Sequence, residues 1–426
     1  MRFLILTQFF EPEVGATQVR LSALCRELVR LGHRVEVVTG MPNHPTGRIF
    51  PSYRGRWFCT ELIGGVTVRR TWVYPGNKSG FQRILNYISF MVTCCWGLAV
   101  AHRPDYLFVD SPPIFLGIPG RLAAWWWRRP LVFNVADLWP DSIRDLGVMK
   151  DGLFLRLASV LERWIYRTAD YVTAVTEGIR ETLLQRKRVP KKKVLFLPNG
   201  VDTALFAPQL QDARWKHSLG LSGKRVAIYA GNHGFAAGAE VIIEAANILR
   251  DYSSIHFVFV GDGPQKPGLK RMAERLELTN VSFYDSVSLH RLPRWISIAD
   301  VALVTLRKSG VTGGARPAKA FVMMACGKPI VLAAEGEAQR LIEQAEAGLV
   351  TPPGDGECFA RAIQTVLSDP ALAKRFGESG RRFVCSRFQW SDLVKDWLEQ
   401  LGRGKQVFDT REPLYGTPGK RVAAKS

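Results

Sequence analysis

Two cations follow a pair of glycines late in the chain, in a pattern that suits the binding of an anion. Residues 313–319 read Gly-Gly-Ala-Arg-Pro-Ala-Lys and lead into an apolar helical stretch. Glycine lets a ligand approach the backbone closely, and Pro317 suits the first turn of a helix. Arg316 and Lys319 are therefore candidates to bind a phosphate-like group. The alternative is that both charges only keep the surface soluble.

Backbone amides offer two further places for a negative charge. Gly15 and Ala16 precede a helix expected to begin near Thr17, whose first amides and dipole favour an anion. An ordinary turn is the alternative there. Gly231 and Asn232 open a second glycine-bounded turn directly after an apolar run of strand length.

Several carboxylates follow apolar runs and are candidates for contacts with a substrate. Asp137 and Glu177 lie in the first half of the chain, and the alternative for each is that it only starts a helix or caps a turn. Asp262, Glu335 and Glu337 lie in the second half, just beyond expected strands. For Asp262, the turn itself is a sufficient explanation.

Short buried strands must position these residues, because the chain repeats an apolar run, a loop and a helical stretch. The first forty residues form such a βαβ unit, and ligands of parallel sheets sit at the carboxyl ends of the strands. The pattern restarts near residue 205. We expect an α/β protein with two Rossmann-like domains that face a cleft. The expected strands are Phe3–Thr7, Val35–Thr39, Tyr106–Val109, Leu131–Asn134, Tyr171–Val175, Val194–Leu197, Arg225–Ala230, His256–Val260, Val281–Phe283, Val301–Thr305 and Pro329–Ala333.

The length of 426 residues fits two domains rather than one core. We place an N-terminal Rossmann-like domain at 1–205 and a C-terminal, ligand-binding one at 206–385. A helix at 386–404 carries apolar side chains at helical spacing and is expected to pack back on the N-terminal domain. The polar, basic residues 405–426 read as a loose tail.

The formal charge of +20 predicts an anionic partner, such as nucleic acid, a negatively charged membrane or a phosphorylated substrate. Nucleic acid is disfavoured, because there is no zinc spacing, no aromatic RNA-binding signature and no helix with a continuous basic stripe. Seven cysteines without a CxxC pattern indicate free thiols in a reducing compartment. Met1–Thr7 is too short for a signal peptide, so we expect a cytoplasmic location.

Apolar and basic residues occur together in two segments that suit a membrane interface. Three tryptophans at 125–127 are followed by Arg128 and Arg129, and Trp and Arg share the headgroup layer of a bilayer. Ile84–Ala101 is mainly apolar, but Asn86, among other polar residues, interrupts it. We interpret it as a buried or surface-lying helix, not a membrane span, and expect peripheral attachment to an anionic membrane.

A series of short motifs resembles glycosyltransferase family 4, in the branch that builds bacterial capsule, O-antigen and colanic-acid-like polysaccharides. The resemblance spans roughly residues 1–402, and the order and spacing of the motifs carry it. The motifs are Ser111-Pro112-Pro113, Asp137-Leu138-Trp139-Pro140-Asp141-Ser142, Pro198-Asn199-Gly200-Val201-Asp202, Tyr229-Ala230-Gly231-Asn232, Val260-Gly261-Asp262-Gly263-Pro264, Met324-Ala325-Cys326-Gly327-Lys328-Pro329, Gly348-Leu349-Val350 and Pro352-Pro353-Gly354-Asp355.

The resemblance implies a GT-B fold and metal-independent transfer of a sugar from a nucleotide donor, with retention at the anomeric carbon. It places the donor mostly on the C-terminal domain and the acceptor mostly on the N-terminal one. The leaving diphosphate would be held by Lys319, Arg316 and exposed amides. Asp137 is the first choice for a catalytic carboxylate, and Glu177 would bond hydroxyl groups of donor or acceptor.

This sequence departs from the family's pattern at five positions. A histidine, an arginine, a lysine and two glutamates of the family are replaced here by Ala136, Asn232, Ala237, Gly314 and Val322. A valine cannot accept the hydrogen bonds of ribose hydroxyls, and each lost charged hydrogen bond weakens binding by about 1.5–3 kcal/mol. Either another residue binds the ribose in place of the missing glutamate, or the protein is weakly active or inactive.

The sequence thus predicts a hexosyl- or acetamidosugar transferase that acts on a lipid-diphosphate acceptor at the inner face of a membrane, without a metal. Two alternatives stay open. A catalytically degenerate scaffold at the membrane would explain Ala136, Asn232, Ala237 and Val322 together. A sugar-nucleotide epimerase of related architecture would need no acceptor.

Overall fold

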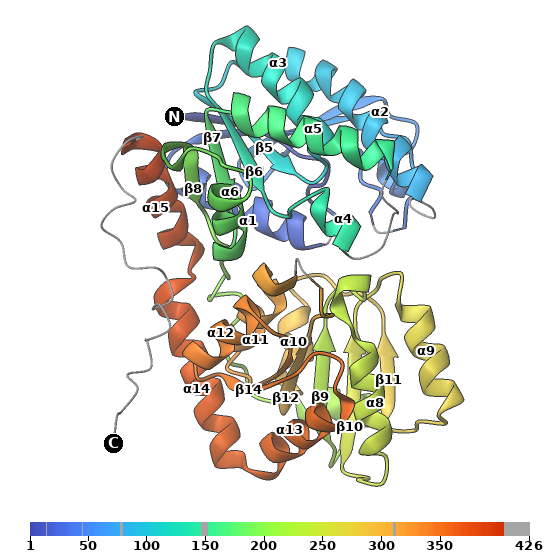
Figure 1. Cartoon of the computed structure of the whole chain (residues 1–426). Helices are drawn as coiled ribbons and strands as arrows, with labels where there is room; N and C mark the ends of the chain where they lie inside the picture. The colour runs from blue at the N-terminus through green and yellow to red at the C-terminus, as the bar shows by residue number, and fades with distance from the viewer. Residues whose placement is uncertain (14, 45, 77–79, 146–151, 310–311, 404–426) are drawn as a thin grey trace, which may run out of the picture.

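The computed structural model describes residues 1–13, 15–44, 46–76, 80–145, 152–309 and 312–403. Two sheets, each covered by helices on both faces, form an N-terminal and a C-terminal domain that lie one above the other (Figure 1). Every neighbouring pair of strands within the two sheets is parallel except β3 and β4. The two-domain α/β architecture expected from the sequence is confirmed.

The N-terminal sheet has eight strands in the order β3-β4-β2-β1-β5-β6-β7-β8. Their bounds are β1 Arg2–Leu6, β2 Arg34–Gly40, β3 Phe58–Ile63, β4 Val66–Thr71, β5 Tyr106–Ser111, β6 Leu131–Val135, β7 Tyr171–Ala174 and β8 Val194–Phe196. The α-helices of this domain are α1 Ala16–Arg30, α2 Gly80–Ala99, α3 Gly117–Trp127, α4 Asp141–Asp145, α5 Leu153–Thr168 and α6 Glu177–Gln185. Helices α2, α3 and α5 pack on one face of this sheet, and α1 packs on the other.

The C-terminal sheet has six strands in the order β11-β10-β9-β12-β13-β14. Their bounds are β9 Arg225–Ala230, β10 Ile255–Val260, β11 Val281–Tyr284, β12 Val301–Thr305, β13 Ile330–Ala333 and β14 Gly348–Thr351. The helices are α7 Ala213–Ser218, α8 Glu240–Ile248, α9 Lys266–Arg275, α10 Leu292–Ser297, α11 Ala318–Ala325, α12 Glu337–Gln344, α13 Gly356–Ser368 and α14 Pro370–Arg387. Helices α8, α9 and α13 cover one face, and α10, α11, α12 and α14 cover the other.

The central strands form where the sequence has continuous apolar runs, because a parallel sheet with helices on both faces buries every side chain. In β1, Phe3 through Leu6 are fully buried, and the strand pairs with β2 on one side and β5 on the other. Since the strands are parallel, their carboxyl ends meet at one edge of each sheet. These edges hold the loops in which the sequence placed its candidate residues.

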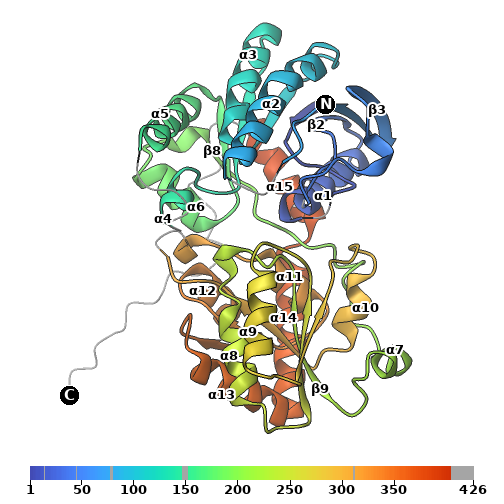
Figure 2. The ribbon, with the colours of Figure 1, turned by 90° about the vertical axis from the view of Figure 1, so that its right-hand side faces the viewer.

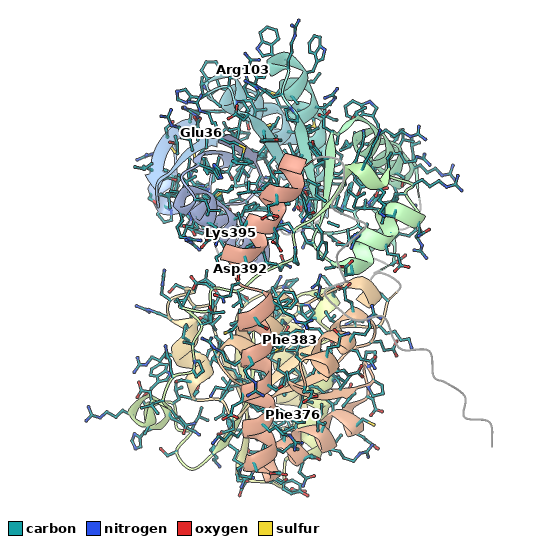
Figure 3. All side chains as sticks on the ribbon, turned by 90° about the vertical axis from the view of Figure 1, so that its left-hand side faces the viewer. Glu36, Arg103, Phe376, Phe383, Asp392 and Lys395 are labelled. Carbon is teal, nitrogen blue, oxygen red and sulfur yellow. The ribbon has the colours of Figure 1, made fainter. Side chains whose placement is uncertain are left out.

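The chain returns from the C-terminal to the N-terminal domain near its end. Helix α14 packs on the C-terminal sheet, and α15 (Trp390–Arg403) continues from it onto the N-terminal domain (Figures 2 and 3). Figure 3 shows the switch between Phe383 on α14 and Asp392 on α15. The expected return helix is confirmed, while the tail at 405–426 lies outside the described residues.

The hairpin of β3 and β4 was not anticipated from the sequence. These strands are joined by Gly64 and Gly65, both with positive φ, and β3 forms the edge of the sheet. Because every side chain of β3 is partly or fully exposed, the strand lacks the continuous apolar run that marked the others.

Along the described part of the chain, no helix combines the length and apolar character needed to cross a bilayer.

Candidate active site

Two turns at the carboxyl edge of the C-terminal sheet lie in direct contact. Gly231 follows β9 and Gly261 follows β10, with φ values of 139° and 143°. A Cβ atom on Gly261 would lie 2.0 Å from the carbonyl oxygen of Gly231, so no larger residue fits. The glycines therefore bring two backbone turns together where ligands of such sheets bind.

Lys319 reaches this pair of turns from the first turn of α11. Its Nζ donates to the Tyr229 hydroxyl at 2.5 Å and lies 3.8 Å from the centroid of the Tyr229 ring. Loss of solvation on burial lowers the pKa of Lys319 to about 7. An ammonium in this position gains from an anionic ligand, because the ligand would replace the lost solvation. Lys319 thus lies beside Gly231, another residue for which the sequence predicts a role in anion binding.

His233 lies behind the first turn and was not singled out from the sequence. Its side chain is fully buried, and neither ring nitrogen has a hydrogen-bond partner among the described residues. The ring packs at 5.3 Å from Tyr229 and 5.9 Å from Phe259. Burial, and then the charge of Lys319, lowers the pKa of His233 to about 4. The imidazole is therefore neutral at physiological pH.

The other predicted members of this edge lie at the same two turns. The Asn232 carbonyl accepts a hydrogen bond from Tyr229 at 2.9 Å, and the Asn232 side chain lies against Gly263. Asp262 is exposed, and its Oδ1 accepts from the amide of Gly263 at 2.8 Å. Gly231 and Asn232, Asp262, and Lys319 come from three separate parts of the sequence and thus form one cluster.

Arg316 and Glu337 form a second cluster, at the boundary between the domains. Arg316 Nε lies 2.6 Å from Glu337 Oε1, and both side chains are almost fully buried. Glu337 also accepts from the amides of Glu177 at 3.1 Å and Gly178 at 2.8 Å, so it caps the N-terminus of α6 in the other domain. In this conformation the charge of Arg316 is balanced by a carboxylate of the protein.

Glu177 points along α6 and not toward the Lys319 cluster. Its carboxylate pairs with Arg180 at 3.1 Å. The neighbouring Thr176 donates to the carbonyl of Gly314 at 2.8 Å, which adds a second link between the domains. Glu177 is the first residue of α6, and α6 contacts the C-terminal domain at this end.

Asp137 and the Gly15 turn lie at the carboxyl edge of the N-terminal sheet. Asp137 Oδ2 accepts from Ser142 Oγ at 3.0 Å, and burial raises the pKa of this carboxyl. Gly15 is the residue before α1, with Ala16 as the first helical residue, so the predicted helix start is confirmed. A Cβ on Gly15 would lie 2.5 Å from Oε1 of Gln18, the side chain nearest to this helix start.

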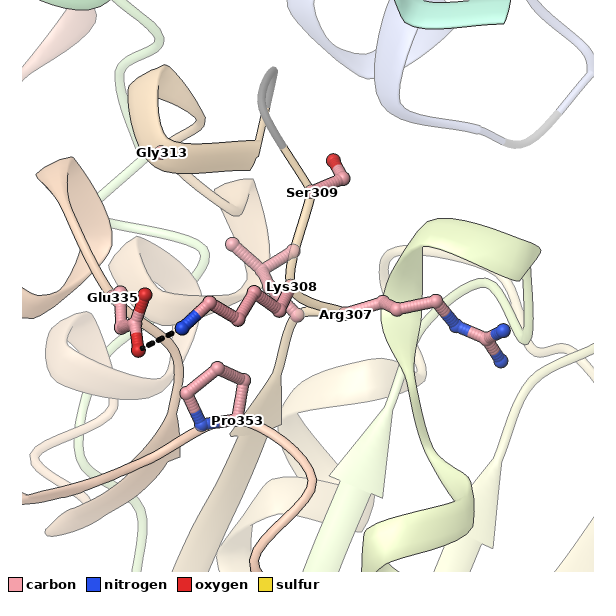
Figure 4. Close-up of a pocket in the computed structure, with 7 residues that line it drawn as sticks. Arg307, Lys308, Ser309, Gly313, Glu335 and Pro353 are labelled. Carbon is pink, nitrogen blue, oxygen red and sulfur yellow. Dashed lines mark hydrogen bonds and ion pairs between the residues drawn. The ribbon is translucent and has the colours of Figure 1, made fainter. Parts of the chain in front are cut away.

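Glu335 lies in the wall of a small pocket at the carboxyl ends of β12 and β13 (Figure 4). Its Oε1 is 3.2 Å from Nζ of Lys308, and Pro353 also lines the pocket. Figure 4 shows Arg307 pointing away from this pocket, where it pairs with Glu240 at 2.6 Å. Both members of the Lys308–Glu335 pair are largely exposed. Within the described residues, no group of three or more His, Cys, Asp or Glu side chains is placed to hold a metal ion.

Two family models match the chain, one for each sheet. The glycosyl transferase 4-like domain matches residues 15–200, and the glycosyl transferases group 1 domain matches residues 211–383. The chain belongs to the GT-B glycosyltransferases. The family resemblance predicted from the motifs is thereby confirmed.

Two bacterial proteins are among the relatives of this glycosyltransferase. It is 29% identical over 345 residues to WcaI of Escherichia coli K12, whose name describes a colanic acid biosynthesis glycosyl transferase; the match covers 79% of this chain and 84% of WcaI. It is 28% identical over 270 residues to WbjE of Pseudomonas aeruginosa, named as a glycosyltransferase, covering 62% and 67% of the two chains.

Solved structures agree with the fold of the glycosyltransferase. HepE from Anabaena, in complex with UDP-glucose, has a TM-score of 0.72 at 19% identity, covering 95% of this chain and 100% of HepE. Sucrose-phosphate synthase from Thermosynechococcus elongatus has a TM-score of 0.73 at 20% identity, covering 94% and 98%.

The departures of this glycosyltransferase from its family's motifs have a partial structural explanation. Gly314 lies against Gly178 of the other domain, where a Cβ on Gly314 would be 3.2 Å from the Gly178 Cα. A glutamate at 314 would therefore crowd this contact between the domains. Val322 packs against the apolar core of the C-terminal domain. Nothing in the structure shows what replaces its missing carboxylate.

Proposed function

We propose that this glycosyltransferase transfers a sugar from a nucleotide-sugar donor to a lipid-linked acceptor, with retention at the anomeric carbon, in the synthesis of a cell-surface polysaccharide. The observation that carries the donor assignment is the Lys319 ammonium, held beside the paired turns of Gly231 and Gly261. The complex of HepE with UDP-glucose and the name of WcaI support the donor class and the polysaccharide.

Charge development in the reaction explains why a cation belongs at this edge. When the bond between sugar and diphosphate breaks, negative charge builds on the leaving diphosphate, and donors placed in advance lower the barrier. Lys319 and the amides at Gly231 and Gly15 would supply them. No metal ion takes part in this proposal.

The remaining predicted residues receive roles in the same proposal. Asp137 faces the reaction from the N-terminal domain and acts as the catalytic carboxylate. Glu177 would bond hydroxyl groups after its ion pair with Arg180 opens. Asp262, Asn232 and Glu335 contact the nucleoside and the sugar. Arg316 and Glu337 would reach the donor only after a rearrangement of their mutual ion pair.

The acceptor is proposed to be a lipid diphosphate at the inner face of an anionic membrane. The net charge of +20 favours attraction to such a surface, and association would be peripheral.

The test is transfer by the full-length protein from a panel of uridine, guanosine and thymidine diphosphate sugars, with polyprenyl-diphosphate sugar in detergent micelles as the acceptor. We expect one donor class to give a glycosylated lipid with the anomeric configuration of the donor, in buffer with EDTA as well as without it. No transfer from any donor, together with no calorimetric binding of the three nucleoside diphosphates, would leave the scaffold alternative. An epimeric sugar nucleotide formed without acceptor would indicate the epimerase.

A further inference from the structure

Three neighbouring helices of the N-terminal domain expose apolar stripes on their outer faces. Helix α3 packs between α2 and α5, and the three form the outer layer on one side of the sheet (Figures 1 and 2). The exposed large apolar residues of these helices are Phe81, Ile88, Val92 and Trp96 of α2, Leu122, Trp125 and Trp126 of α3, and Leu153, Leu157, Val160 and Trp164 of α5.

The spacing shows that these side chains form stripes and are not scattered. Trp125 and Trp126 lie three and four residues after Leu122, on the same side of the helix, and are 68% and 77% exposed. Soluble proteins rarely expose apolar side chains in such a contiguous set unless the set binds something. We call the exposed outer surface of α2, α3 and α5 the three-helix face.

The charges on the three-helix face have one sign. Helices α2 and α3 contain no Asp or Glu, and the one acid of α5, Glu162, is buried and paired with Lys187 at 2.7 Å. Arg156, Arg163 and Arg167 form an exposed stripe along α5, beside its apolar stripe.

More cations border the three-helix face. Arg128 and Arg129 follow α3, and Arg103 donates to the carbonyl of Trp127 at 3.1 Å. Figure 3 shows Arg103 at the end of the molecule remote from the C-terminal domain. The basic segment 186–193 is tied to the end of α5, because Lys193 donates to the carbonyl of Ala169 at 2.7 Å. An anionic surface is therefore the electrostatic complement of this face.

We propose that the three-helix face docks on the headgroup layer of a leaflet that contains anionic phospholipid. Tryptophan prefers this layer because its ring is apolar and its N–H polar, and arginine places its stem along the apolar region and its charge among the phosphates. On the three helices themselves, an apolar stripe and a parallel basic stripe occur without an exposed acid, which is the pattern of helices that lie in an interface. Asp105 and Asp170 at the border pair with Arg129 and Arg121, and the other bordering arginines and lysines still give an excess of cations. A protein partner or a second copy would meet the apolar stripes, but it would leave this excess unexplained.

Docking on the membrane does not depend on the proposed function, but its role in bringing the enzyme to a lipid-linked acceptor does. The face belongs to the domain to which the family resemblance assigns the acceptor. Docking would thus hold that domain against the leaflet that contains the lipid-linked substrate.

The test is binding of the full-length protein to vesicles of phosphatidylglycerol and phosphatidylcholine, measured by sedimentation and by quenching of tryptophan fluorescence with brominated lipid. We expect partition onto phosphatidylglycerol vesicles at least about tenfold stronger than onto pure phosphatidylcholine, and weaker binding as salt is raised. The double variants Trp125→Ser/Trp126→Ser and Arg163→Gln/Arg167→Gln should each lose about tenfold or more of this partition.

Leu210→Ser is the matched control, because Leu210 is 96% exposed but belongs to the C-terminal domain. Leu210→Ser should bind vesicles as the unaltered protein does. All variants should keep the melting temperature of the unaltered protein. Equal vesicle binding by the Trp125→Ser/Trp126→Ser variant would overturn the proposal. So would a dimer in solution that this variant dissociates, together with no binding to vesicles.

Micelle assays separate this proposal from the proposed function. The tryptophan variant should transfer sugar normally to acceptor in detergent micelles and poorly to acceptor in vesicles. Vesicle binding by an unaltered protein that transfers no sugar in micelles would refute the proposed function and leave the docking face intact. Transfer in both settings by a protein that binds no phosphatidylglycerol vesicles would refute the docking face alone.

Discussion

The Lys319 ammonium changes its protonation near neutral pH, because burial lowers its pKa to about 7. A bound diphosphate would favour the charged form. Nucleoside diphosphate affinity should therefore be highest below pH 7 and fall by about tenfold between pH 6.5 and 8.5. Lys319→Ala should weaken binding at pH 6.5 by about ten- to a hundredfold and remove the pH dependence. Isothermal titration with uridine, guanosine and thymidine diphosphates measures both effects.

Lys270→Ala controls for net charge, because Lys270 is exposed on α9, away from the glycine turns. It should bind nucleoside diphosphates as the unaltered protein does. If Lys319→Ala retains full affinity, the phosphate site lies elsewhere.

His233 gives a second pH effect, on stability. Its pKa of about 4 in the folded protein lies below the ordinary value of 6.5, so between these values the unfolded chain takes up a proton that the folded protein does not. Stability is therefore lost as pH falls from about 6.5 to 4. Urea unfolding at pH 7 and 4.5 should show that this loss is about 2–3 kcal/mol smaller in His233→Leu than in the unaltered protein.

The exposed His290 provides the comparison. His290→Leu should keep the pH dependence of the unaltered protein. A pH dependence that His233→Leu also leaves unchanged would mean that the buried imidazole titrates normally.

At the scale of elements, the contact between α6 and α12 depends on one buried ion pair. Glu337 balances Arg316 and accepts two amides of α6. Glu337→Ala should lower the free energy of unfolding by about 3–5 kcal/mol, because it leaves a buried guanidinium without its carboxylate partner. Arg316→Met combined with Glu337→Ala should restore part of the loss.

The nearby Glu335 offers a matched control two residues away. Its pair with Lys308 is exposed, so Glu335→Ala should change the free energy of unfolding by less than about 1 kcal/mol. Equal losses for the two glutamates in urea unfolding would contradict a special role for the buried pair.

For the whole molecule, α15 makes the N-terminal core depend on the last described helix. Trp397 is fully buried, 6.0 Å from the ring of Phe3 and 5.7 Å from that of Phe108. Trp397→Ala should cost about 3–5 kcal/mol through the cavity that it leaves. Hydrogen exchange should accelerate in β1 and β5 more than in β12 and β13.

Lys395, on the exposed side of the same helix, is the control. Lys395→Ala should leave exchange in both sheets unchanged. Faster exchange confined to the C-terminal sheet of Trp397→Ala would contradict the assignment of α15 to the N-terminal core.

The sequence by itself determined the alternation of strands and helices, the two-domain plan and the return helix, because these depend on local apolar periodicity. Runs such as residues 226–230 are hydrophobic throughout, and a strand buried on both faces requires that. The edge strand β3 lacks this signal. The glycine turns at Gly231 and Gly261 could likewise be read from the sequence, since their residues are adjacent to strands.

Only the tertiary structure decided which charges are free to meet a ligand. Arg316 and Lys319 look alike in sequence, three residues apart on one glycine-rich stretch. Folding brings Glu337 to Arg316 and the Tyr229 ring to Lys319, so one cation is neutralised by a carboxylate while the other is left beside a glycine turn. Pairing energy depends on distance in space, which separation along the chain does not fix. The apolar stripes of α2, α3 and α5 likewise form one face only after folding, because they are separate in the sequence.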